Sequence, residues 1–461
     1  MTRVLVTTAS MAGHLRPVSA VVRELTSAGH DVVWATGPDY LAEVTAVGAR
    51  AVAMGGEEAS GGRPATVRQG RVSGVVGLRH ALDEVFLRPL PAAVAAVQRL
   101  VDEVRPDVVL ADQGCLAGPL VAEARDLPRV TVSVSPLGLA SVDTGPFGSG
   151  LPPTATRHGH FRNRLLNRVL PGVVLADLQR RANDVRTGLG LAPLPELFLD
   201  WSMRVADRVL AVGVEALEYP RSDLPVPVTF VGVLPAPATG GGATPATGGG
   251  ATPAWLADLP AARAAGRPVL LVTQGTVTTD PRNLVLPAVA GLATPSDPAG
   301  RHAPAEWGPL VVVTTADRDP DEVFPPASRP RGLRVARTLP FDAVLPHTDV
   351  LVTNGGYGGV LAALAAGVPL VVAGTTEDKL EVGNRVARAG CGVALRTDRP
   401  GERELAAAVH RVRADPAFRE RARAVARDLA AAPGPAGAAA LVLEAAARHT
   451  GAIGPGMSGS P

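Results

Sequence analysis

The chain has 461 residues and a formal net charge of +2, and 46% of its residues are hydrophobic while 19% are charged. This composition is typical of globular proteins, and a length above ~300 residues predicts two or three domains. The small net charge provides no electrostatic basis for binding nucleic acid or an anionic membrane surface.

Cysteine usage and the N-terminus bear on the location of the protein. The sequence holds 2 cysteines, Cys115 and Cys391, so no disulfide framework is predicted and a reducing cytoplasm is expected. The first predicted strand begins directly after Met1-Thr2-Arg3, which leaves no room for a signal peptide. No apolar run reaches the ~18–20 residues of a membrane helix, so no membrane insertion is expected.

Short apolar runs alternate with helical patterns in the first half of the chain. The predicted strands are 4–7, 31–35, 108–111, 129–134, 210–212 and 229–231, and a helix is predicted from about Pro17 to Ala28. Such alternation favours a parallel sheet with both faces covered.

Residues 238–253 repeat an eight-residue unit of Ala, Thr, Gly and Pro, a composition that predicts a flexible linker. Beyond it the alternation resumes, with predicted strands at 269–272, 310–313, 334–336, 350–353 and 370–373. We therefore predict an α/β protein of two Rossmann-like domains. Its ligand is expected in the cleft between them, because open parallel sheets bind ligands at the carboxyl ends of their strands.

The stretch Asn354-Gly355-Gly356-Tyr357-Gly358-Gly359 separates a predicted strand from a helix predicted over 360–366. Free N–H groups and the positive end of the helix dipole make such a turn an anion site. Its four glycines let the backbone approach a bulky group such as a pyrophosphate. A tight turn without a ligand is an equally good reading of this stretch alone.

Two other residues form a candidate acid–base pair. His14 follows the first strand and opens the first helix, where the helix N-terminus favours a neutral imidazole that can accept a proton. Asp112 ends the strand at 108–111, at the same edge of the same predicted sheet, where it could orient the ring and stabilise its charged form. A structural turn histidine and a helix-capping aspartate are the alternatives.

Further candidates follow strands of the second half. Gly275-Thr276 resembles a phosphate-binding loop, although an ordinary turn is the simpler interpretation. In Glu377-Asp378-Lys379 the two carboxylates could accept hydrogen bonds from sugar hydroxyls, or the three residues could form a solvated charge cluster at the start of a helix. The sequence lacks a dinucleotide fingerprint, a P-loop and a zinc motif, so no metal site and no cofactor are expected.

Taken in order, these motifs resemble the GT-B-fold nucleotide-sugar glycosyltransferases of family 1, especially the bacterial natural-product (macrolide-type) branch, over nearly all of residues 1–430. The matching residues are Gly13-His14-Leu15-Arg16-Pro17, Gly29-His30-Asp31-Val32, Gly275-Thr276, and the run from Leu345-Pro346-His347-Thr348-Asp349 to Gly367-Val368-Pro369. The resemblance implies an acceptor-binding domain at 1–235, the linker at 236–254 and a nucleotide-sugar-binding domain at 255–430. A helix at 431–450 would cross back to the first domain, followed by a disordered tail at 451–461.

The resemblance also implies roles. His14 would be the general base that deprotonates the acceptor hydroxyl, Asp112 would orient it, and the sugar would be transferred with inversion and without a metal ion. The implied substrate-binding residues are Gly13, Gly275, Thr276, Phe341, Asn354, Gly355, Gly356, Gly358, Gly359, Glu377, Asp378 and Lys379.

The chain departs from the family at several of these positions. Asn354 replaces a phosphate-binding His, Lys379 replaces the Gln of an Asp-Gln pair that reads sugar hydroxyls, and Phe341 stands near the position of a base-stacking Trp. Ala362 replaces the Glu that holds the ribose hydroxyls in plant relatives, which favours a TDP-linked over a UDP-linked donor.

The predicted function is therefore transfer of a hexose or deoxyhexose from a TDP- or UDP-sugar to a hydroxyl of a small, apolar natural-product acceptor. Two alternatives remain open at this point: a non-catalytic protein that binds nucleotide-sugars, and a GT-B sugar-nucleotide epimerase. The sequence leaves a monomer and a homodimer both open.

Overall fold

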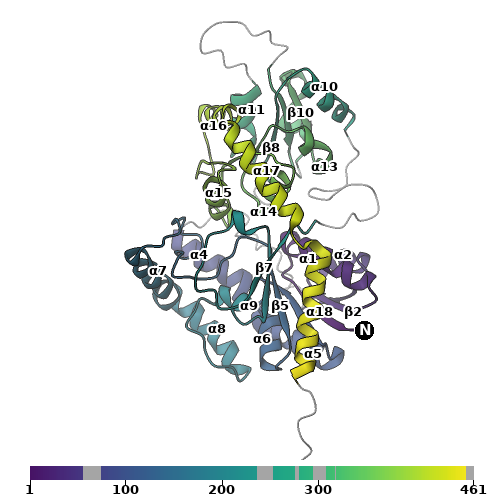
Figure 1. Cartoon of the computed structure of the whole chain (residues 1–461), viewed down its shortest axis with the longest axis vertical. Coiled ribbons are helices and arrows are strands. Elements are labelled where there is room, and N and C mark those ends of the chain that lie inside the picture. Colours follow the sequence, from purple (N-terminus) through teal and green to yellow (C-terminus); the bar gives the residue numbers. More distant parts are fainter. Residues whose placement is uncertain (55–73, 236–252, 276–279, 294–307, 317, 453–461) are drawn as a thin grey trace, which may run out of the picture. The chain divides into compact units, whose positions relative to one another are not determined.

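The computed structural model describes residues 1–54, 74–235, 253–275, 280–293, 308–316 and 318–452 (Figure 1). The chain divides into two compact units. Unit 1 comprises Met1–Val212, Tyr219–Pro237 and Pro433–Pro461, and unit 2 comprises Gly213–Glu218 and Ala238–Ala432. Most of the predicted linker and tail lies outside the described residues.

Unit 1 is built on a parallel sheet of seven strands in the order β3-β2-β1-β4-β5-β6-β7. The strands are β1 (Arg3–Thr7), β2 (Asp31–Thr36), β3 (Arg50–Ala53), β4 (Val108–Asp112), β5 (Arg129–Ser133), β6 (Arg208–Val212) and β7 (Val228–Gly232). The six strands expected here are confirmed within two residues at each end, and β3 is an additional short edge strand.

The order in which the chain adds strands to the sheet reverses between β1 and β4. These strands are neighbours, with Thr7 paired to Ala111, whereas the connections from them lead away in opposite directions. Ligands of open α/β sheets bind at such a switch point, outside the carboxyl ends of the two strands. His14 and Asp112 belong to this edge.

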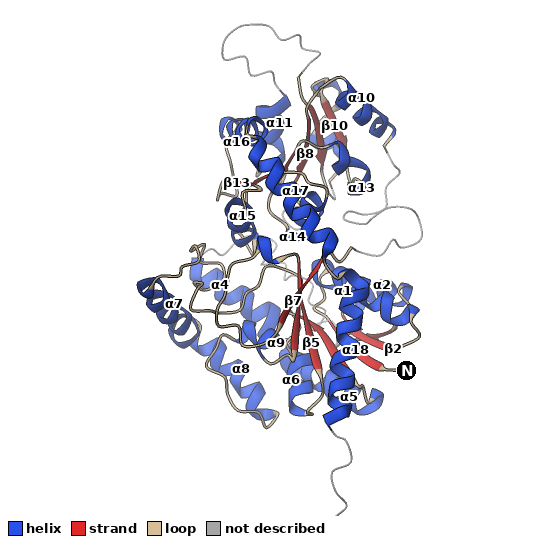
Figure 2. Ribbon diagram, in the orientation of Figure 1, coloured by secondary structure: helices blue, strands red, loops and turns tan. Residues whose placement is uncertain are grey.

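Helices cover the sheet of unit 1 (Figure 2). They are α1 (Ala12–Ser27), α2 (Leu41–Ala46), α4 (Gly74–Leu82), α5 (Leu90–Val104), α6 (Ala117–Ala124), α7 (Arg157–Val169), α8 (Ala176–Gly188), α9 (Trp201–Arg204) and α18 (Gly434–Ala452). The final helix α18 packs beside α1 (Figure 1) and also contacts β4 and β7.

The first helix begins earlier than predicted. Its predicted start was about Pro17, a residue type that is favoured at the first helical position. In the structure α1 starts at Ala12 and carries Pro17 in its second turn, so that His14 lies in the first turn.

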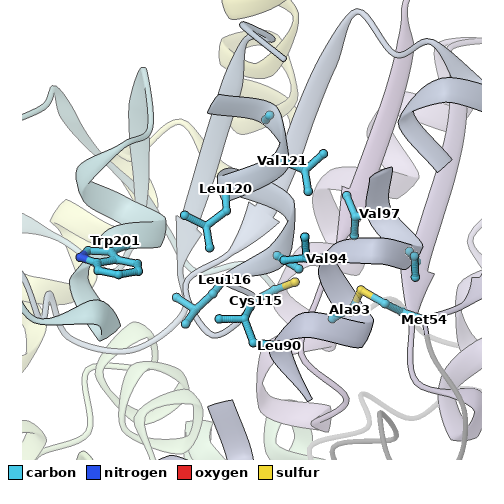
Figure 3. Close-up of a cluster of buried hydrophobic side chains, with 14 of the residues drawn as sticks. Met54, Leu90, Ala93, Val94, Val97, Cys115, Leu116, Leu120, Val121 and Trp201 are labelled. Carbon is cyan, nitrogen blue, oxygen red and sulfur yellow. The ribbon is translucent and has the colours of Figure 1, made fainter. Parts of the chain in front are cut away.

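The main core of unit 1 lies between the sheet and helices α5 and α6 (Figure 3). Alternate strand residues such as Leu5 and Val109 meet Val94, Val97 and Leu120 there, all of them buried. Burial of this apolar surface, at about 25 cal/mol per Å², is what holds β1 and β4 in a fixed position. The core thus forms a rigid base beneath the switch point.

Unit 2 has a parallel sheet of six strands in the order β10-β9-β8-β11-β12-β13. The strands are β8 (Val269–Thr273), β9 (Leu310–Thr314), β10 (Leu333–Ala336), β11 (Val350–Thr353), β12 (Leu370–Val372) and β13 (Gly392–Ala394). The five predicted strands are confirmed, and β13 was not predicted. Here the order in which the chain adds strands reverses between β8 and β11, where Thr273 pairs with Thr353.

The helices of unit 2 are α10 (Asp258–Ala264), α11 (Val285–Ala293), α12 (Pro320–Val323), α13 (Phe341–Val344), α14 (Tyr357–Ala365), α15 (Lys379–Arg388), α16 (Glu402–Ala414) and α17 (Pro416–Ala431). Helix α14 starts three residues before the predicted position, so Tyr357, Gly358 and Gly359 form its first turn. Within the described ranges, no single helix is long and apolar enough to span a membrane, although the bent pair Pro416–Ala431 and Gly434–Arg448 passes by length and composition.

Candidate active site

His14 and Asp112 are in direct contact at the switch point of unit 1. His14 Nδ1 lies within hydrogen-bonding distance of Asp112 Oδ2. The Asp112 side chain is fully buried, whereas the His14 side chain remains 22% exposed. The imidazole therefore has its carboxylate partner on the protein side and is partly accessible.

Two backbone N–H groups fix the Asp112 carboxylate. The N–H of Ala9 donates to Oδ1 and that of Gly114 donates to Oδ2, each at 2.7 Å. A carboxylate with these donors accepts from His14, so Nδ1 carries the hydrogen and Nε2 is the basic nitrogen of the neutral ring. Helix α6 begins only at Ala117, so Asp112 is not its capping residue.

Gly114 lets the two side chains approach. A Cβ atom at this position would lie 2.8 Å from His14 Cε1 and Nδ1 and 3.0 Å from Asp112 Oδ2. The next residue, Cys115, is buried in the core of unit 1, and burial raises the pKa of its thiol to about 11. Cys115 therefore packs as a neutral, small apolar side chain and not as a nucleophile. Gly13, adjacent to His14, has open space where its Cβ would be.

The turn after β11 forms the corresponding site of unit 2. The Asn354 amide donates to the carbonyl oxygen of Gln274, and its Oδ1 accepts from the N–H of Gly356 at 3.3 Å. Asn354 is 7% exposed, and this bond ties the turn after β11 to the turn after β8. Gly275 follows Gln274 with φ +74°, and Thr276 lies outside the described residues. Asn354 thus organises the turn.

The glycines of this turn fall into two kinds. Gly355 has φ +94°, and a Cβ there would lie 2.9 Å from Val372 Cγ1, so the fold itself requires glycine. By contrast, a Cβ at Gly358 would meet no described atom within 4 Å, and one at Gly356 would come only to 3.9 Å from Asn354 Oδ1. A glycine inside a helix costs about 1 kcal/mol relative to alanine. Packing against the described residues therefore gives no reason for glycine at position 358.

Of the other predicted residues of unit 2, Phe341 and Lys379 lie against this turn. Phe341 is 6% exposed, and its Cε2 lies 3.8 Å from where the Cβ of Gly359 would be. Lys379 begins α15, and its ammonium group contacts the carboxylate of Glu377. Asp378 precedes α15 at the N-cap position without a capping hydrogen bond from its side chain.

Sequence reasoning missed Gln274, Gly114 and Gly374 as supporting residues. A Cβ at Gly374 would lie 2.1 Å from the carbonyl oxygen of Asn354, which makes it part of the same turn. Each of the three lies within two residues of a strand end or of a predicted site residue, and that proximity was the available signal. No group of three metal-ligating side chains occurs in the part of the chain that the structure describes.

Comparisons with known proteins agree on one family. Residues 309–445 match the model of the erythromycin biosynthesis protein CIII-like C-terminal domain. The chain is 37% identical over 420 residues to 4'-demethylrebeccamycin synthase of Lentzea aerocolonigenes, covering 90% of this chain and 93% of the relative. It is 30% identical over 431 residues to UDP-glucosyltransferase 1 of Beauveria bassiana, covering 90% and 88%.

The fold has solved counterparts. The glycosyltransferase VinC, solved in complex with DTDP, aligns with a TM-score of 0.68 at 21% identity, covering 97% of this chain and 100% of that one. Two parallel α/β units and these alignments establish the GT-B fold. The chain belongs to the family of GT-B glycosyltransferases of natural-product biosynthesis.

Proposed function

We propose that this glycosyltransferase is inverting and metal-independent, and that it moves a hexose or deoxyhexose from a TDP- or UDP-sugar to a hydroxyl of a small, apolar natural product. The observation that carries this proposal is the contact between His14 Nδ1 and the buried carboxylate of Asp112. A protein that only bound nucleotide-sugars would have no use for a histidine oriented in this way.

In the proposed reaction His14 Nε2 accepts the proton of the acceptor hydroxyl. The acceptor oxygen forms a bond to the anomeric carbon while the bond from that carbon to the diphosphate oxygen breaks, and this single displacement inverts the configuration. The resulting imidazolium is stabilised by Asp112. General-base assistance of this kind contributes about 10²–10⁴-fold to the rate.

The leaving diphosphate would be bound at the start of α14. The open space over Gly356 and Gly358 supports this assignment, as do the N–H groups and dipole of the first helical turn. With the Asn354 amide engaged by the Gln274 carbonyl, backbone N–H groups would provide most of the contacts to the phosphates.

For the nucleotide of the donor, we propose TDP in preference to UDP. Ala362 lies half-buried on α14 and offers no hydrogen-bond acceptor to a ribose 2′-hydroxyl, which favours TDP. The relative from Beauveria bassiana is named as a UDP-glucosyltransferase, whereas VinC was solved with DTDP. Thermal shifts of the purified protein with UDP, TDP, ADP and GDP separate these donors, since a ligand at 100 times its Kd adds about 2.7 kcal/mol.

The decisive variant is His14→Ala. It should lose transfer by about 10²–10⁴-fold while the thermal shift with the preferred nucleotide is retained. His410→Ala, an exposed histidine on α16, is the matched control and should transfer normally. Unchanged turnover of His14→Ala would refute its assignment as the base.

A further inference from the structure

Helix α7 of unit 1 (Figure 1) presents apolar side chains to its exterior. Phe161 is 68% exposed and Leu165 is 51% exposed, and because one helical turn separates them they lie on the same face. Val173, in the π-helical turn Leu170–Val174 that continues α7, is 69% exposed. A surface helix ordinarily packs its apolar face against the core. Helix α7 departs from this pattern along the face that carries these residues.

Polar side chains attach the opposite face of α7 to the rest of unit 1. Asn163 is the one buried residue of α7, and its amide donates to the carbonyl oxygen of Val142 at 2.9 Å. The Asn167 amide donates to two further carbonyl oxygens of the same segment, at 3.0 and 3.2 Å. Asn163 is two residues from both Phe161 and Leu165, which at about 3.6 residues per turn places it on the other side of the helix. The exposure of the two apolar side chains therefore follows from how α7 is attached.

The exposed face of α7 is also basic. Arg157, Arg164 and Arg168 are exposed on it, and none of them forms an ion pair with a residue that the structure describes. Residues 144–176 contain no Asp or Glu. The net charge of +2 for the whole chain therefore conceals a local excess of positive charge. Exposed charges interact only over about 8 Å at physiological ionic strength, so this local excess decides what the face attracts.

The exposed face of α7 comprises Arg157, Phe161, Arg164, Leu165 and Arg168. We infer that this face docks the protein on an anionic lipid bilayer, on which the helix lies without spanning it. Lipid phosphates attract the guanidinium groups, while the apolar side chains enter the boundary between headgroups and acyl chains. Arginine suits this boundary, because its aliphatic part packs with apolar groups while its charge stays among the headgroups.

A bilayer fits this face better than an acidic protein does. An acidic protein surface would satisfy the arginines, but it would also need a preformed pocket for each apolar side chain that projects between them. A bilayer takes up such side chains without a preformed pocket. The inference goes beyond the proposed function and does not depend on it.

The first test is co-sedimentation of the full chain with vesicles of phosphatidylglycerol and phosphatidylcholine in equal amounts, compared with vesicles of phosphatidylcholine alone. The wild-type protein should bind the anionic vesicles, and more weakly at high salt. Combining Arg157→Gln, Arg164→Gln and Arg168→Gln should weaken binding about 10²-fold, since each arginine near an anionic surface contributes about fivefold. The control removes the same charge from exposed arginines of α16 and α17 and should bind like the wild type: Arg403→Gln, Arg413→Gln and Arg427→Gln.

The second test addresses the apolar side chains. Phe161→Ser combined with Leu165→Ser keeps the charge and should weaken binding to the anionic vesicles at least about tenfold. Both side chains are exposed, so the thermal unfolding of the free protein should not change. In Phe161→Trp, the added fluorescence should shift to shorter wavelength when the anionic vesicles are added. His410→Trp, at an exposed position of α16, should show no such shift.

Three outcomes would overturn the inference. One is a wild-type protein that does not bind the anionic vesicles. Another is equal weakening by the two sets of arginine substitutions, which would mean that only total charge matters. The third is binding that depends on the arginines of α7 but not on Phe161 and Leu165, which would indicate an acidic macromolecule as the partner. None of these measurements uses a nucleotide-sugar, so their outcome is separate from that of the proposed function.

Discussion

Gly114 determines how closely His14 and Asp112 approach each other. Its N–H orients the carboxylate, and the absence of a side chain leaves room for the imidazole. Catalysis depends on such positioning, since a displacement of about 1 Å can cost about 10²-fold in rate. Gly114 is therefore as important for the geometry of the pair as the two residues that form it.

We predict that Gly114→Ala lowers kcat about 10- to 100-fold and leaves the donor KM nearly unchanged, because the new methyl group displaces the His14 ring. Steady-state kinetics with the preferred donor measure this split. Gly188→Ala, at the end of α8 with open space around it, is the control and should keep full activity. Normal kcat in Gly114→Ala would show that the ring position is not critical.

Single residues also show what the sequence could reveal. The residue types and strand-end positions of His14 and Asp112 predicted a pair. Their contact depends on β1 and β4 being neighbours, because His14 and Asp112 are 98 positions apart in the sequence. Strand order is set by packing of the whole sheet and cannot be predicted from the local sequence. For the same reason the contact between Asn354 and Gln274 could not be predicted.

Among the elements, α14 combines weak intrinsic helix formation with a proposed binding role. Its first turn contains Gly358 and Gly359, which are poor helix formers, and for that reason the sequence predicted a later start. Tertiary packing overrides this preference, since Val360, Leu361 and Leu364 are buried at 0–1% exposure. The short edge strands β3 and β13 escaped prediction because three or four residues give too little alternation to recognise.

We predict opposite effects of Gly358→Ala on stability and on binding. The free energy of unfolding should rise by about 0.5–1 kcal/mol, because alanine favours the helix and meets no described atom. Affinity for the nucleoside diphosphate should fall at least about tenfold, because the methyl group occupies the proposed ligand space. Thermal unfolding with and without nucleotide measures both. Gly188→Ala should leave binding unchanged, and equal binding by both variants would exclude close approach of the ligand to Gly358.

At the scale of the whole molecule, alternating patterns predicted two α/β units correctly, and the GT-B architecture follows from them together with the family motifs. The segment Gly213–Glu218 is an exception to a simple division, because it connects β6 and β7 of unit 1 but belongs to unit 2. No local sequence pattern indicates that this segment belongs to unit 2. A buried charge cluster explains it: Arg385 on α15 contacts Glu218 and Glu381, and all three side chains are at most 5% exposed.

We predict that Arg385→Met increases local opening of both Gly213–Glu218 and α15, because it removes the guanidinium that the buried carboxylates of Glu218 and Glu381 contact. Breaking a buried ion pair costs about 3–5 kcal/mol, so local opening should increase by about 10²-fold or more. Amide hydrogen exchange should therefore accelerate in Gly213–Glu218 and in α15 together.

Arg448→Met removes an exposed ion pair with Glu444 on α18 and serves as the control. Its effect on the free energy of local opening should stay within about 1 kcal/mol. Faster exchange in α15 alone, with Gly213–Glu218 unchanged, would mean that the segment is held in unit 2 by other contacts, such as the packing of Gly213 against the Tyr357 hydroxyl. Faster exchange in both would show that the ion pair between Arg385 and Glu218 joins the β6–β7 connection to α15.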